Sequence, residues 1–282
     1  ASAAARAPAP KLRDVAEADA VVIGAGFSGL STALHLARRG LGVVVLEANA
    51  VGWGASGRNN GQVIPTLTAA EPDGMVAKYG DAGALLAKLV GGSADYLFQV
   101  AREEGIMEIA EAEQSGWFQP AHSPGRIRLS EKRVAAWNRH GFPAEMLDRK
   151  AATDLLGTDF WYGGMYNPTG GHINPLGLAR GLALAAERHG AVIHEDSPVT
   201  EWKREGDFWR VKTPDGEVKA RALVLATNAY TDHITANLAP KLSRTVVPVL
   251  SWQMATEPLG DNLRAKILPG RQAVSDTRGD LR

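Results

Sequence analysis

Cysteine is absent from the 282 residues, which excludes disulfides, thiolate metal ligands, a cysteine nucleophile and a thioether link to a cofactor within this chain. Net charge is absent too, because 31 basic side chains balance 31 acidic ones. No overall field therefore draws the protein to nucleic acid or to an anionic membrane. The lack of cysteine fits a reducing compartment, so we expect a cytoplasmic protein with no nucleic-acid partner.

Long hydrophobic runs are also missing. The longest, residues 43–46 and 222–226, suit strands and fall far short of the roughly 20 apolar residues of a membrane helix. We therefore expect no membrane span. The opening ASAAARAPAPKLRD is rich in alanine and proline, and we expect residues 1–18 to form a flexible arm.

A dense glycine pattern follows this arm in DAVVIGAGFSGLSTALHLARRGLGVVVLEA, residues 19–48. Short apolar runs at 20–23 and 43–46 are typical of strands buried on both faces. Between them, apolar side chains recur on one helical face, and Gly40 suits the end of that helix. The segment predicts a βαβ unit with a short crossover helix, whose buried face comprises Leu30, Ala33, Leu34 and Ala37.

The glycines and one acid of this unit match the needs of a dinucleotide. Gly24 permits a sharp turn, Gly26 lets a diphosphate approach the backbone, and Gly29 lets the helix pack closely on the strand. Glu47 ends the second strand, where its carboxylate can accept both hydroxyl protons of an adenosine ribose; an acid there disfavours NADP. The pattern favours the ADP part of NAD or FAD over the alternative, a tight turn that binds nothing.

The loop that follows, VGWGASGRNNGQ at residues 51–62, contains small and amide residues. Small residues let a main chain lie against a flat ring, Ser56 can meet a phosphate, and Arg58 can offset diphosphate charge. Asn59 and Gln62 could hydrogen-bond a ring or orient the loop. Taken alone, the same letters also describe an ordinary surface turn.

Placed after the ribose-binding acid, this loop resembles the glycine/D-amino acid oxidase (DAO) family of FAD-dependent oxidoreductases. It is most similar to the gamma-glutamylputrescine oxidase-like branch, in which a GxGASGRNGGQ-type segment runs from the ribose of FAD toward the isoalloxazine ring. Asn60 stands where the family commonly has glycine. The resemblance extends from Asp19 to the C-terminus and implies FAD, held non-covalently because the loop has neither histidine nor cysteine.

Two later segments carry the same resemblance. Val199 matches a residue whose backbone contacts adenine, and the end of ALVLATNAYT matches a second dinucleotide-contact strand, although VLAT alone would also suit a plain buried strand. Together the motifs and the resemblance indicate these cofactor-binding residues: Gly24, Gly26, Phe27, Ser28, Gly29, Glu47, Ala48, Gly54, Ala55, Ser56, Arg58, Asn59, Asn60, Gly61, Gln62, Val199, Ala226, Thr227 and Asn228.

The fold that the resemblance implies is α/β. We expect a Rossmann-type FAD-binding domain of the GR2/DAO-like kind from residues 19–69 and 164–235, interleaved with an α+β substrate domain from residues 70–163 and 236–282. The substrate domain should have a mixed or antiparallel sheet that includes a strand in SWQMATEPLG, residues 251–260. Family members continue beyond that strand, so we expect an incomplete sheet and, as partner, a completing C-terminal polypeptide or the remainder of the same chain.

Local patterns add several elements to this expectation. Helices are predicted over 82–104, weakened at Gly91-Gly92, over 124–140, over a turn at 153–156, and from Pro175 to Gly190 with Asn174 as the cap. A strand at 191–194 and a three-stranded meander, broken at 205–207 and 214–216, follow. The last strand of the meander, 222–226, is apolar enough to enter a buried sheet.

The chemistry that the resemblance implies is oxidation of a C–N bond in an amine or amino acid by hydride transfer to flavin N5, with oxygen as acceptor and peroxide released. An NAD-dependent dehydrogenase and a non-catalytic subunit that binds the ADP half remain alternatives. No catalytic residue can be assigned, since His122 and His172 suit structural roles better, and no spacing indicates a metal site. The candidates for lining a substrate chamber, or for ordinary packing, are Trp117, Phe118, Trp161, Tyr162, Trp252 and Gln253.

Overall fold

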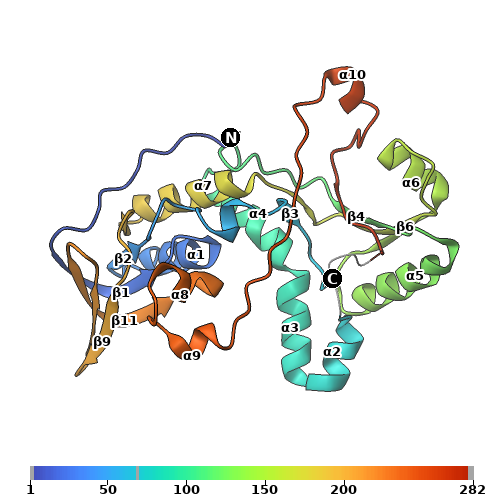
Figure 1. The fold of residues 1–282 in the computed structure, drawn as a ribbon. Helices are drawn as coiled ribbons and strands as arrows, with labels where there is room; N and C mark the ends of the chain where they lie inside the picture. The colour runs from blue at the N-terminus through green and yellow to red at the C-terminus, as the bar shows by residue number, and fades with distance from the viewer. Residues whose placement is uncertain (1–2, 68–69, 279–282) are drawn as a thin grey trace. The chain divides into compact units, whose positions relative to one another are not determined.

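The computed structural model describes residues 3–67 and 70–278 and divides the chain into two compact units. The first unit comprises Ala1–Asn60, Glu108–Glu111 and Asn174–Gln253. The second comprises Gly61–Met107, Ala112–Ile173 and Met254–Arg282. The chain therefore enters each unit more than once (Figure 1).

The first unit is built on a six-stranded sheet in the order β8-β2-β1-β11-β10-β9. The first four strands run parallel and the last two join by antiparallel pairs. Ile23 pairs with both Leu46 and Leu225, so the carboxyl ends of three parallel strands meet at one edge. The strands are β1 (Val15–Ile23), β2 (Val43–Leu46), β8 (Val192–His194), β9 (Glu201–Glu205), β10 (Phe208–Lys212) and β11 (Glu217–Leu225).

Two long helices of this unit pack together, and both begin as the sequence predicts. Asn174 caps α7 by accepting a hydrogen bond from Gly177 N at 3.1 Å, and Pro175 occupies the first turn. The predicted apolar face of α1 is buried. The helices are α1 (Phe27–Ala37) and α7 (Pro175–Arg188), with the short η1 (Ala55–Gly57), η2 (Asn228–Tyr230), α8 (Thr231–Ile234) and α9 (Pro240–Ser243).

The expectation of a flexible arm over residues 1–18 is wrong for most of that range. The strand β1 already begins at Val15, five residues before the predicted apolar run. Leu12 is buried and joins the core cluster of the sheet. The side chain of Arg6 is only 5% exposed and pairs with Glu187. Apolar burial and an ion pair therefore hold a segment whose composition suggested disorder.

The second unit has a four-stranded mixed sheet, as the resemblance implied, and a separate two-stranded sheet that was not expected. The strand order of the four-stranded sheet is β12-β4-β6-β5, with β12 parallel to β4 and the other pairs antiparallel. The strands are β4 (Trp117–Pro120), β5 (Glu145–Leu147), β6 (Gly164–Asn167) and β12 (Ala273–Val274), and separately β3 (Gln62–Val63) with β7 (Gly171–His172).

The helices of the second unit include the predicted segments 82–104, 124–140 and 153–156, and two helices, at 72–79 and 261–264, that were not predicted. Gly91-Gly92 does more than weaken the long helix, because the chain there divides into two helices. The helices are α2 (Pro72–Tyr79), α3 (Asp81–Gly91), α4 (Ser93–Glu103), α5 (Pro124–Arg139), α6 (Arg149–Leu156) and α10 (Asp261–Arg264). Within residues 3–67 and 70–278, no helix combines the length and the apolar character needed to cross a bilayer.

The predicted strand at residues 251–260 is not formed. This segment has no regular structure, and Trp252 is 93% exposed. A strand requires a neighbour whose backbone completes its hydrogen bonds, and none of the described residues pairs with this segment. The burial expected for 222–226 is also incomplete, since Leu225 pairs with Ile23 yet is 41% exposed.

Candidate dinucleotide-binding site

The turn from β1 into α1 can be made only by glycine at two positions. Gly24 has φ +104°, and a Cβ there would lie 2.7 Å from Ala226 O. A Cβ on Gly29 would lie 1.9 Å from Gly24 O, which is inside the backbone of the same turn. The strand-to-helix packing that the sequence predicted for Gly29 is thus confirmed.

Glu47 lies immediately after β2, at the edge where the parallel strands end. Its carboxylate accepts hydrogen bonds from Ala25 N at 2.8 Å and from Asn49 N at 2.9 Å. Burial raises the pKa of this carboxyl, and the charge of Glu195 acts in the same direction, while the backbone donors oppose both. A half-buried acceptor is therefore fixed beside the glycine turn.

The start of α1 is joined to the glycine-rich loop by one serine. Ser56, in η1, accepts a hydrogen bond from Phe27 N at 3.0 Å. A Cβ on Gly26 would lie 2.8 Å from Ser56 Oγ, so glycine is needed for this approach. The Ser56 oxygen serves as acceptor here, which leaves its O–H to donate to a ligand. First-turn N–H groups of a helix lack intrahelical partners and favour anions.

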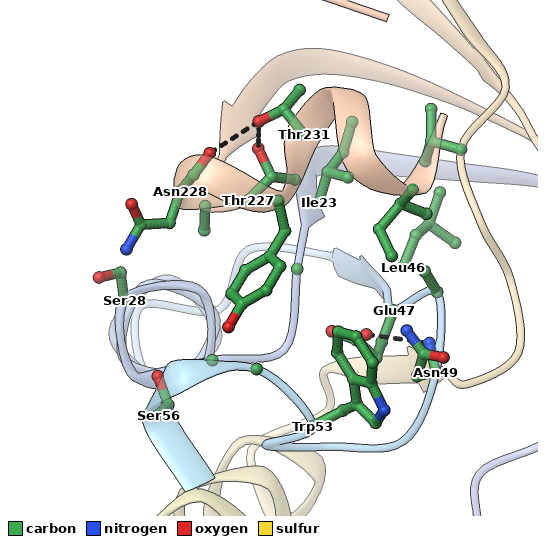
Figure 2. A pocket seen from close by; sticks show the side chains of 18 of the residues that line it. Ile23, Ser28, Leu46, Glu47, Asn49, Trp53, Ser56, Thr227, Asn228 and Thr231 are labelled. Atoms are coloured by element: carbon green, nitrogen blue, oxygen red, sulfur yellow. Dashed lines mark hydrogen bonds between the residues drawn. The ribbon is translucent and has the colours of Figure 1, made fainter. Parts of the chain in front are cut away.

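These groups line one pocket within the first unit (Figure 2). The space between its lining residues amounts to about 830 Å³, including the part that is open to solvent. Thirteen of the predicted cofactor-binding residues line it: Gly24, Gly26, Phe27, Ser28, Glu47, Ala48, Gly54, Ala55, Ser56, Val199, Ala226, Thr227 and Asn228. The sequence therefore located segments that are 200 residues apart in the chain on a common surface.

The other residues of the lining carried no recognised motif. Trp53 and Tyr230 face each other with ring centroids 5.7 Å apart, in an edge-to-face pair. The side chains of Thr227 and Thr231 are hydrogen-bonded at 2.6 Å (Figure 2). The lining residues that the sequence analysis missed are Ile23, Leu46, Asn49, Trp53, Tyr230, Thr231, Ile234, Thr235 and Leu238. Position beside a recognised motif was the signal for Trp53, Asn49 and Tyr230.

Six predicted residues do not line the pocket: Gly29, Arg58, Asn59, Asn60, Gly61 and Gln62. The Arg58 guanidinium lies over the Trp53 ring, 4.7 Å from its centroid. Asn59 donates hydrogen bonds to Ala55 O and Ser56 O and so closes the η1 turn. Gly61 and Gln62 belong to the second unit.

The chamber candidates separate into packed and exposed groups. Trp117 and Phe118 lie in the hydrophobic core of the second unit, as the packing alternative held. Trp252 is almost fully exposed, which contradicts the packing alternative for this residue. Gln253 is exposed as well. Trp161 stacks edge-to-face on Phe160 at 5.0 Å, and Tyr162 receives the Arg149 guanidinium at 5.2 Å.

The two histidines considered as catalysts both contact protein groups of the second unit. His122 Nδ1 lies 2.8 Å from Thr277 Oγ1, and His172 Nε2 lies 3.8 Å from a Glu113 oxygen. Neither lines the pocket of the first unit. Across the described ranges, 3–67 and 70–278, no three acidic or histidine side chains gather closely enough to hold a metal ion.

The parallel sheet, the glycine turn and the half-buried acid after β2 define the class of dinucleotide-binding α/β proteins. Within that class, the sequence profile of the FAD dependent oxidoreductase (DAO) family matches residues 19–281, and the chain belongs to this family.

Curated relatives agree with this assignment. The chain is 32% identical over 278 residues to gamma-glutamylputrescine oxidoreductase of Escherichia coli (strain K12), covering 98% of this chain and 63% of that protein. It is also 32% identical to the probable oxidoreductase OrdL of Haemophilus influenzae, covering 95% of this chain and 62% of that one. The chain thus spans less than two thirds of the length of these relatives.

A solved structure shows the same fold. Glycine oxidase from Geobacillus kaustophilus superposes with a TM-score of 0.65 at 22% identity, over 78% of this chain and 57% of that one. The predicted α/β fold, with a parallel sheet and a second, mixed sheet, is confirmed over this partial length.

Proposed function

We propose that the pocket of the first unit binds the ADP part of a non-covalent FAD. The observation that carries the proposal is a half-buried carboxylate and a helix N-terminus within one pocket, in a chain of the FAD-dependent family. The ADP part is common to NAD and FAD, so the pocket alone does not distinguish the two cofactors. Membership of the FAD-dependent family favours FAD. An ADP-binding pocket also serves a non-catalytic subunit, which the assay below distinguishes.

Three polar features of the pocket have defined roles in this proposal. Glu47 accepts the two hydroxyl protons of the adenosine ribose, the contact for which a carboxylate is suited at this position. The first turn of α1 and the Ser56 hydroxyl donate to the diphosphate, whose charge the helix dipole stabilises. Val199 and Leu238 border the pocket with apolar surface for adenine.

The reaction that we propose is oxidation of a C–N bond in an amine or amino acid. When bound, the flavin supplies an acceptor for the hydride that leaves the carbon next to the substrate nitrogen. Its support is the match to the FAD-dependent family and to a relative named for gamma-glutamylputrescine. Because the chain spans under two thirds of that relative, the activity belongs to the whole protein.

Anaerobic reduction of the bound flavin tests this proposal. Protein reconstituted with FAD is mixed with gamma-glutamylated amines, polyamines or amino acids, and loss of the oxidised flavin absorbance is followed. A substrate that bleaches the flavin, and that yields peroxide and the hydrolysed imine when oxygen is admitted, would support an oxidase. Bleaching without peroxide would replace oxygen by another acceptor. Flavin that binds but is bleached by none of these classes would favour the non-catalytic subunit.

The raised pKa of Glu47 predicts a pH dependence of nucleotide binding. The ribose hydroxyls donate to the charged carboxylate, so protonation of Glu47 removes the charge and converts one of the two acceptor oxygens into a hydroxyl donor. Burial raises the pKa of this group above its ordinary value of 4.5. ADP affinity should therefore fall as the pH is lowered, starting at a higher pH than an exposed glutamate would give. Titrations of the wild-type protein with ADP at successive pH values should show this fall in affinity. The Glu47→Gln variant, which has no carboxyl group at this position, should not show it.

A further inference from the structure

The N-terminal segment from residue 3 to residue 14, which we call the N-terminal strap, is attached to the turn at residues 195–197. Arg6 Nη1 lies 3.4 Å from Glu195 Oε1, and Ala9 N donates to the other oxygen of this carboxylate. Leu12 N donates to Ser197 Oγ at 3.0 Å. The strap therefore contacts one short turn at three places, with a buried apolar side chain, Leu12, beside them.

The same turn holds the chain just after β2. Three hydrogen bonds join residues 195–197 to residues 47–51: Asp196 N to Asn49 O at 3.0 Å, Ser197 N to Glu47 O at 2.8 Å, and Val51 N to Glu195 Oε1 at 2.6 Å. Glu47 and Asn49 both line the pocket. The turn thus stands between the strap and the proposed ribose acceptor.

Glu195 is the residue common to both sets of contacts. Its side chain is 6% exposed, and one oxygen receives both Val51 N and the Arg6 guanidinium. A buried carboxylate needs a cation or several donors to offset the cost of desolvation. Without Arg6, this carboxylate would keep its charge near Glu47 with one fewer partner, and the turn would lose the ion pair that fixes it.

We infer that the N-terminal strap is a positioning element for the nucleotide pocket, in which Arg6 holds Glu195 and Glu195 holds the 47–51 segment that presents Glu47. The inference rests on the proposed binding of the ADP part. Arg6 itself does not line the pocket, and it acts through the carboxylate and the backbone that follow β2.

The test compares Arg6→Ala with Lys11→Ala in the full chain. Lys11 belongs to the same strap, but its side chain is 37% exposed and its ion pair is with Asp215, not with Glu195. Calorimetric titration with ADP should show about tenfold or greater weakening for Arg6→Ala, the scale of a lost charge-assisted contact, and no change for Lys11→Ala. Equal affinities of the two variants would overturn the inference.

A second ligand separates positioning from general loss of structure. 2′,3′-Dideoxy-ADP lacks both hydroxyls that would donate hydrogen bonds to Glu47. The position of Glu47 should therefore not affect its affinity, and wild type and Arg6→Ala should bind it equally. Equal weakening for ADP and the dideoxy analogue would indicate a damaged fold and would contradict a positioning role. If wild-type protein binds neither ligand, the proposed function itself fails, and the inference fails with it.

A compensating variant gives a further readout. In Arg6→Ala/Glu195→Gln the buried negative charge is removed and the amide oxygen can still accept from Val51 N, although the amide nitrogen cannot accept from Ala9 N. ADP affinity should return toward the wild-type value in this double variant. Affinity that stays as low as in Arg6→Ala would show that the ion pair does not act through Glu195.

Discussion

Replacing Glu47 by alanine is expected to weaken ADP binding by about 2–4 kcal/mol, or roughly 30- to 700-fold in Kd. The reason is the loss of one or two hydrogen bonds from the ribose to a half-buried, charged acceptor. Two backbone donors, Ala25 N and Asn49 N, also lose their acceptor. Direct titration of the purified variant with ADP measures the effect.

Glu17→Ala is the matched control for this substitution. Glu17 lies in β1 of the same sheet, but its side chain is 76% exposed and its Lys219 partner is 3.6 Å away. Removing a surface carboxylate of this kind changes stability by less than about 0.5 kcal/mol and should leave ADP affinity intact. An unchanged Kd in folded Glu47→Ala would show that this acid is not the ribose acceptor.

Gly29→Ala is expected to have the largest effect on the fold of the first unit. The added Cβ would lie 1.9 Å from Gly24 O and 3.3 Å from the Ala226 side chain, so β1 and α1 must separate. Overpacking of this kind costs about 1–3 kcal/mol, and a contact with backbone belongs at the upper end. ADP binding should be lost with the turn. Chemical denaturation and ADP titration on the same variant measure both effects.

Gly42→Ala tests whether the effect depends on position. Gly42 precedes β2 in the same unit, and a Cβ there would meet nothing closer than an Asp19 oxygen at 3.5 Å. We expect a change in stability within about 0.5 kcal/mol. If Gly29→Ala were tolerated as well as Gly42→Ala, the close helix–strand packing described here would be wrong.

The β1–turn–α1–β2 segment could be predicted from the sequence because each of its determinants is local. Glycine at 24 and 29 is required by atoms of the same turn or of the strand beside it, and the apolar period of α1 is set within eleven residues. Glu47 was recognised for the same reason, since its place follows directly from the end of β2. Local rules of this kind do not need the rest of the chain.

The opposite wall of the pocket depends on contacts between distant residues. Trp53 and Tyr230 meet across more than 170 positions, and neither carries a spacing that reveals its partner. The position of Arg58 also depends on this part of the pocket, because its guanidinium lies on the Trp53 ring. Side-chain pairs of this kind depend on tertiary packing, which periodicity does not encode.

Two segments were misjudged because composition was considered without partners. The alanine- and proline-rich N-terminal strap is held by two single residues. Arg6 pairs with Glu187, and Leu12 packs into the hydrophobic core of the sheet, and neither partner can be identified from the composition of the strap. The segment 251–260 has the apolar residues of a strand but no neighbouring strand among the described residues, and Met254 is fully exposed. A strand sequence becomes a strand only when a partner is present.

Competition between FAD and ADP tests the central claim most directly. The folded chain is titrated with FAD, and the bound FAD is then challenged with ADP. If the glycine turn and Glu47 hold the nucleotide half of the cofactor, FAD should bind at one saturable site and ADP should displace it. Two results would contradict the account: FAD that binds equally well in the presence of saturating ADP, and a folded chain that binds neither FAD nor ADP.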